Sequence, residues 1–89
     1  MPIDLTKVKK EILDREILRI GMIAELDAVS LYEQLAAMTQ SEDMKKVLLD
    51  IAKEEKTHVA EFETLLLKYD GEKKQENEAG KKEVEKLTG

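Results

Sequence analysis

Glu55 and His58 are the residues whose types and spacing first indicate chemistry. They are three positions apart, so on a helix they share one face and could reach one cation together. His58 is the only histidine of the chain. The sequence also contains no cysteine, which excludes disulfides, thiolate metal sites and thiol catalysis. Carboxylates and one imidazole are therefore the metal-binding groups that this sequence offers.

A second carboxylate, Glu25, lies as far before the predicted turn as Glu55 lies after it. Glu25 precedes Gln40 by 15 residues, and Glu55 follows Gln40 by 15. A turn near Gln40 would therefore bring Glu25 opposite Glu55 and His58. A desolvated carboxylate without a partner is costly, and a bound cation would remove that cost. Oxygen donors with one imidazole are typical of non-haem iron or manganese sites.

Two long helices are expected to position these groups. The first has a candidate N-cap at Asp4 or Thr6 and runs without proline to about Thr39. Ser41, which two acids follow, predicts the N-cap of the second helix, and Asp70-Gly71 predicts its end. Apolar stripes with steps of three and four comprise Leu18, Met22, Glu25, Val29, Tyr32, Leu35 and Ala36 in the first helix, and Met44, Leu48, Ile51, Glu55, His58, Phe62, Leu65 and Tyr69 in the second.

Two further positions on the first helix carry expectations of their own. Gly21 destabilises a helix interior by up to about 1 kcal/mol relative to alanine, so it predicts a close approach by another backbone. Tyr32 lies seven residues after Glu25 on the same face, where its hydroxyl could hydrogen-bond a metal ligand or water. Simple packing of Tyr32 with one hydrogen bond is an equal alternative. The residues expected in the core include Met22, Met44, Phe62 and Tyr69.

Composition predicts an all-α fold. Of the 89 residues 42% are hydrophobic but only 3% aromatic, a balance that favours helices over sheets. Residues 1–70 are predicted to form an antiparallel two-helix hairpin, and residues 71–89 a polar linker with a short helix over 81–87 or a tail. A chain this short buries a modest fraction of its surface, so we expect a homo-oligomer in which two hairpins form a four-helix bundle.

Charge and hydropathy exclude several classes of function. The net charge is −5, and lysine and glutamate are interspersed along most of the chain, as on a solvated helix surface. No basic stripe with interleaved aromatic residues indicates nucleic-acid binding. No apolar run has the length of a membrane span or the character of a signal peptide. The sequence therefore predicts a cytoplasmic protein.

One chain supplies half of a known ligand set. Di-iron carboxylate sites in four-helix bundles take a Glu from each of two helices and a Glu-x-x-His element from each of the other two. Glu25 matches the first kind of ligand, and Glu55 with His58 matches the second. A two-fold dimer would complete the set, with one pair of irons per dimer at the subunit interface.

Two stretches together carry a resemblance to a known family. ELDAVSLYEQ at 25–34 and EEKTH at 54–58 resemble the encapsulated ferritins, with similarity over about residues 15–70. The resemblance implies that Glu25, Glu55 and His58 bind iron across a two-fold interface, that dimers assemble into a decameric ring, and that Fe(II) is oxidised inside an encapsulin shell. Members are either separate cargo or the N-terminal part of an archaeal shell protein, and residues 85–89 resemble the junction of the fused form.

Three functions follow as alternatives. The first is a ferroxidase that oxidises Fe(II) to Fe(III) for mineral storage in an encapsulin nanocompartment. The second is a rubrerythrin-like di-iron peroxidase or oxidase, which the lack of cysteines for an electron-delivering iron centre disfavours. The third is a metal-free helical oligomerisation module, in which Glu25 forms an interhelical salt bridge and His58 packs at an interface.

Overall fold

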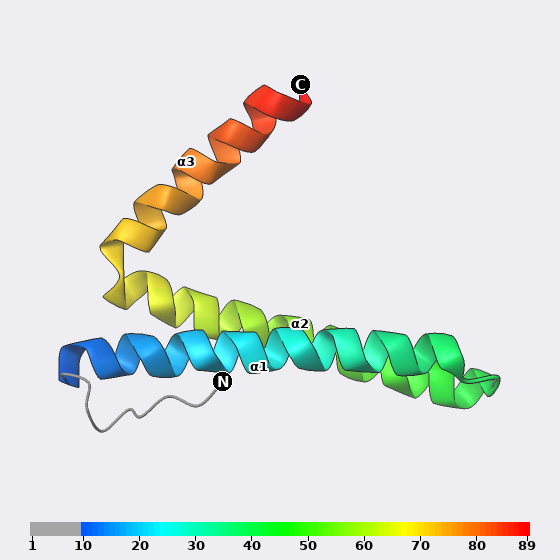
Figure 1. Ribbon diagram of the computed structural model, residues 1–89. Coiled ribbons are helices and arrows are strands. Elements are labelled where there is room, and N and C mark those ends of the chain that lie inside the picture. Colours follow the sequence, from blue (N-terminus) through cyan, green and yellow to red (C-terminus); the bar gives the residue numbers. More distant parts are fainter. Residues whose placement is uncertain (1–9) are drawn as a thin grey trace.

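The structure, a computed structural model, describes residues 10–89, and this part of the chain contains three helices (Figure 1). They are α1 (Lys10–Met38), α2 (Glu42–Tyr69) and α3 (Gly71–Thr88). α1 and α2 run antiparallel and side by side, and α3 leaves the end of α2 and projects away from the hairpin. The predicted all-α class and the helical hairpin are confirmed. The predicted N-caps Asp4 and Thr6 lie outside the described residues.

The connection between α1 and α2 is short because hydrogen bonds satisfy the helix ends locally. The Ser41 side chain accepts a hydrogen bond from the Met44 backbone N–H at 3.2 Å, as expected of an N-cap. The Ser41 N–H donates in turn to the Thr39 hydroxyl at 3.1 Å. Glu42 and Asp43 add negative charge to the first turn of α2, where the helix dipole favours it. This turn fixes which residues of α1 and α2 face each other.

The interior of the hairpin is narrow. The buried apolar side chains are Leu18, Val29, Ala36, Ala52 and Leu66. The two alanines are each only 2% exposed, and their small side chains let the helix axes approach closely. Five buried side chains make a small core for two helices of this length. Most of the predicted apolar stripe therefore lies at the edge of the helix contact.

One side of the hairpin presents an apolar surface to solvent. Met44 and Tyr69, which the sequence placed in the core, are each 56% exposed in the single chain. Helical spacing puts them on the same side of α2 as Val47 and Leu65, and a hollow joins Leu65 and Tyr69 to Ile17 of α1. We call this surface the open face; its exposed side chains are Ile17, Leu31, Leu35, Met44, Val47, Leu65 and Tyr69. The core prediction for Met44 and Tyr69 is wrong for one chain, because the contact of α2 with α1 leaves both side chains exposed.

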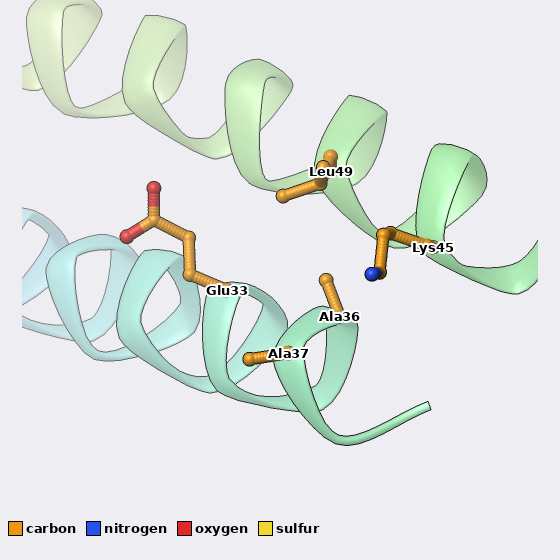
Figure 2. A pocket seen from close by; sticks show the side chains of 5 residues that line it. All are labelled: Glu33, Ala36, Ala37, Lys45 and Leu49. Carbon is orange, nitrogen blue, oxygen red and sulfur yellow. The ribbon is translucent and has the colours of Figure 1, made fainter. Parts of the chain in front are cut away.

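The opposite side of the hairpin also exposes apolar side chains, Ile23 and Leu26 among them. Near the turn, Ala36 and Ala37 of α1 lie opposite Lys45 and Leu49 of α2, and a shallow hollow lies between them (Figure 2). Leu49 is 47% exposed, close to the 44% of Leu65 on the open face. These two leucines therefore form a matched pair on opposite sides of α2.

Asp70 holds the junction between α2 and α3. Its backbone N–H donates to the Leu66 carbonyl at 2.9 Å and closes α2, while its side chain accepts from the Lys73 N–H at 3.0 Å and opens α3. The other carboxylate oxygen accepts from the Arg19 guanidinium of α1 at 2.8 Å. The Lys73 hydrogen bond first and then Arg19 lower the pKa of the Asp70 carboxyl. Through its backbone N–H and its side chain, Asp70 thus connects all three helices.

α3 corrects the sequence-based expectation for the C-terminal segment. A polar linker was predicted before a short helix over 81–87, but the structure contains one continuous helix from Gly71 to Thr88. Asp70 caps its start, and Gly89, at φ +89°, donates its N–H to the Glu85 carbonyl and caps its end. Lysine and glutamate recur at three- and four-residue spacing between these caps, which stabilises a helix without an apolar face.

The contacts of Asp70 predict that the stability of the first turn of α3 depends on pH. Asp70→Ala should unwind the first turn of α3, because it removes both the cap and the Arg19 partner. The pKa of the Asp70 carboxyl is lower in the folded chain than in the unfolded chain, where it is near 3.8. The ionised carboxylate therefore stabilises the fold fully above pH 3.8, and this contribution is lost as the pH falls through the lowered pKa. NMR carbon shifts of residues 71–75 should therefore lose helical character at acid pH in the wild type.

Asp70→Asn is the matched control for this experiment. It keeps an oxygen acceptor for the Lys73 N–H but removes the charge that attracts Arg19. We expect it to keep most of the first turn and to lose the acid transition. An acid transition of equal size in Asp70→Asn would contradict the assignment to this carboxyl.

Candidate metal centre

The hairpin brings Glu25, Glu55 and His58 together. His58 Nδ1 lies 3.4 Å from Glu25 Oε2 and 3.3 Å from Glu55 Oε2. One potential ligand atom from each residue lies within 4.8 Å of the other two. Within the part of the chain that the structure describes, this is the only group of three or more such side chains close enough to hold one metal ion. The predicted match in height between Glu25 and Glu55 is thus correct.

The three side chains differ in their exposure to solvent. The side chains of Glu25 and Glu55 are 24% and 19% exposed, whereas that of His58 is 44% exposed. Helical spacing explains the difference, because His58 lies seven residues before Leu65 on the open-face side of α2, while Glu55 lies nearer to α1. The site is therefore closed on the hairpin side and accessible from the open face.

Small and aromatic side chains flank the site along the helix axes. Ala52 and Val29, both buried, lie about one turn away on the side of the α1–α2 connection. On the other side the Phe62 ring lies against Gly21, where a Cβ on residue 21 would be only 2.7 Å from Phe62 Cε1. The close approach predicted at Gly21 is real, but the partner is an aromatic ring and not a backbone.

Tyr32 lies further along α1 toward the turn and is half-buried. Among the described residues its hydroxyl makes no hydrogen bond to Glu25, Glu55 or His58. Its suggested role as a hydrogen-bond partner of a metal ligand stays a prediction.

The donor set fits a hard or borderline divalent cation. Two carboxylates and one imidazole supply oxygen and nitrogen donors, which suit iron and manganese. Without a cation, the His58 imidazole is the one positively chargeable group in contact with both carboxylates in the described structure. Three protein ligands would leave further coordination positions of such a cation for other donors.

Comparison with known protein families shows to which family this chain belongs. The Rubrerythrin family model matches residues 16–88, which include all three side chains of the site. The chain belongs to the rubrerythrin family. The match begins in α1 and extends to the last residue of α3, so α3 is part of this family unit as well as the hairpin.

Relatives of this rubrerythrin-family chain include two named proteins. A ferritin-like–encapsulin shell fusion protein of Pyrococcus furiosus is 50% identical over 86 residues, which are 97% of this chain and 24% of that protein. The encapsulin nanocompartment cargo protein EncC of Myxococcus xanthus is 35% identical over 68 residues, or 73% of this chain and 52% of EncC. The chain thus spans about a quarter of the first relative and half of the second.

A solved structure is also similar over the full length. The crystal structure of the encapsulated ferritin domain from Pyrococcus furiosus superposes with a TM-score of 0.89 at 45% identity, and covers 100% of this chain and 96% of that one. The resemblance to the encapsulated ferritins is confirmed. No helix among residues 10–89 is both long and apolar enough to span a membrane.

Sequence reasoning missed two features around the site. It did not find the contact of Gly21 with Phe62, although glycine in a helix interior was a usable signal. It also missed Arg19, whose guanidinium binds Asp70 at the junction with α3. A contact over 51 residues of sequence leaves no periodic pattern, so the sequence offered no signal for this ion pair.

Metal binding should stabilise the hairpin. An ion present at 100 times its Kd stabilises the native state by about 2.7 kcal/mol, which raises the Tm of a small domain by roughly 10 °C or more. We expect Mn(II) to raise the Tm of the wild type and chelator to reverse the rise. Glu55→Gln should lose the shift, while Glu54→Gln, which alters the adjacent exposed acid, should keep it. Equal shifts in both variants would exclude Glu55 as a ligand.

Proposed function

We propose that this chain is a ferroxidase that oxidises Fe(II) to Fe(III) at a di-iron site shared by two copies. The observation that carries the proposal is the convergence of Glu25, Glu55 and His58 within 4.8 Å. Membership of the rubrerythrin family and the similarity to an encapsulated ferritin domain support an iron-related role.

The position of the site supports a shared centre. The His58 imidazole is the most exposed of the three ligands and lies among the apolar side chains of the open face. A second copy related by a two-fold axis would cover this face and bring its own Glu25, Glu55 and His58 to the first set. The resulting dimer would be a four-helix bundle with six ligands for one pair of irons. In this arrangement Glu25, Glu55 and His58 of each copy would hold the two irons, and Glu55 would be the candidate to contact both.

The reaction balances with iron as the substrate. Two Fe(II) ions release two electrons, and dioxygen takes them up with two protons to give hydrogen peroxide and two Fe(III) ions. Carboxylate ligands suit both oxidation states, because they compensate the additional charge and tolerate a change in the distance between the metals. The role of the protein would be to hold the two ions side by side.

The relatives support a compartment as the setting. One relative is named as a fusion with an encapsulin shell and the other as an encapsulin cargo protein. We infer that this chain works inside an encapsulin nanocompartment, as cargo or as a part of the shell protein, and supplies Fe(III) for mineral storage there. A decameric ring of dimers is the assembly that the resemblance implies.

A rubrerythrin-like peroxidase is the second candidate, because the family model carries that name. The same ligands would serve, with hydrogen peroxide as the oxidant and two Fe(II) ions as the electron source. The rate of Fe(II) oxidation with peroxide in place of dioxygen, measured anaerobically, separates the two. A rate much higher with peroxide would favour the peroxidase.

Native mass spectrometry during anaerobic addition of Fe(II) tests the shared site. We expect two irons per pair of chains in an even-numbered oligomer, and oxidation once air is admitted. His58→Ala should lose stoichiometric iron and slow oxidation by roughly a hundredfold or more, since it removes one ligand of each ion. Glu54→Gln should behave as the wild type. An assembled wild type without stoichiometric iron would indicate the metal-free oligomerisation module instead.

The open face should be required for iron binding although its side chains do not bind iron. Leu65→Lys places a charge in this face, so it should break the dimer and abolish stoichiometric iron while each chain keeps its own three ligands. Leu49→Lys is the matched control, with similar exposure on the opposite side of α2 (Figure 2). Chain mass and iron content, measured together, check this. Full iron loading of monomeric Leu65→Lys would contradict a shared site.

A further inference from the structure

The Phe62 ring packs on the surface of α1 where Gly21 has no side chain. A Cβ built on residue 21 would lie 2.7 Å from Phe62 Cε1, 2.9 Å from Cζ and 3.0 Å from Cδ1. Ordinary contacts between carbon atoms are about 3.5–4.0 Å, so a methyl group on residue 21 would force the Phe62 ring or α1 to shift. Gly21 and Phe62 thus define how closely α1 and α2 approach at this point.

This contact lies next to the metal site along the helix axes. Gly21 is one turn before Glu25 on α1, and Phe62 is one turn after His58 on α2. Because the helices are antiparallel, these steps lead in the same direction, and the Gly21–Phe62 contact forms the neighbouring layer. The spacing of the helices in one layer is transmitted to the next, because packed helices move as rigid units.

The three ligands depend differently on this spacing. Glu55 and His58 are both on α2, so their 3.3 Å separation is set within one helix. Glu25 is on α1, and its 3.4 Å separation from His58 Nδ1 requires the close approach of the two helices. Any shift of α1 away from α2 would therefore withdraw Glu25 and leave the other two ligands in place.

We propose that Phe62 is a positioning residue that, packed on Gly21, holds Glu25 in coordinating distance of His58. The inference rests on the proposed metal site and explains why a helix interior contains a glycine there. Gly21 destabilises α1 locally, but it allows the spacing at which Glu25 lies close to His58. Phe62 itself touches no metal and acts only through the separation of the helices.

Titration with Co(II), followed by its visible absorption, tests this on the full chain. Gly21→Ala should weaken Co(II) binding by roughly tenfold or more and give the spectrum of Glu25→Gln, since both lose the same ligand. The double variant Gly21→Ala/Phe62→Leu should regain most of the affinity and the wild-type spectrum, because leucine lacks Cε1 and Cζ, the two nearest atoms, and its branched end can turn its Cδ atoms away from residue 21. Gly80→Ala, where a Cβ meets nothing within 4 Å, controls for the change in helix propensity.

Each outcome separates this inference from the proposed function. Wild-type affinity and spectrum in Gly21→Ala would overturn the positioning role and leave the metal site standing. A double variant as weak as Gly21→Ala would also overturn it, because steric pressure from the ring would not be the cause. Absence of Co(II) binding in the wild type would instead overturn the proposed metal site. If Gly21→Ala does not fold, rescue of both folding and the wild-type spectrum by Phe62→Leu decides in favour of the inference.

Discussion

Two carboxylates held close together between apolar helix faces are the constraint on which the rest of this structure depends. Glu25 and Glu55 each have less than a quarter of their side chains exposed, and their oxygens lie within 4.8 Å. Two like charges this close repel each other, and the repulsion is stronger near a protein surface than in water. The one imidazole beside them offers at most a single positive charge. A divalent cation would instead satisfy both carboxylates, and the hairpin is built so that they meet.

Three features of the hairpin bring the Glu25 and Glu55 carboxylates close together. The Ser41 cap keeps the connection short and fixes the register of α1 against α2. The small side chains of Ala36 and Ala52 allow a close approach on the turn side of the site. Gly21 allows the same on the other side, where the Phe62 ring fills the space. Glycine and alanine at these positions reduce the apolar area that one chain buries, which is why its core contains so few side chains.

Local and periodic signals made the hairpin and the site predictable from sequence, and signals of other kinds were missed. Ser41 with its two following acids located the turn, and counting outward from it placed Glu25 beside Glu55. The same reasoning failed for α3, because it weighed apolar contacts such as Val84 and Leu87 and gave too little weight to the caps at Asp70 and Gly89. It also placed Met44 and Tyr69 in a core, since periodicity identifies an apolar face but does not identify the chain that covers it.

The open face and the candidate metal site would both be completed by the same proposed contact with a second copy. A hairpin that buried all its apolar stripe within one chain would leave no room for a second set of ligands beside His58. A hairpin with a polar surface around His58 would leave the ion in contact with water on one side, with three protein ligands. An apolar surface around a partly exposed imidazole would favour the proposed association of two copies, and that association would bring ligands of like kind into one low-dielectric space. Under the proposed function, one second copy would therefore both cover Leu65 and Tyr69 and complete the metal site.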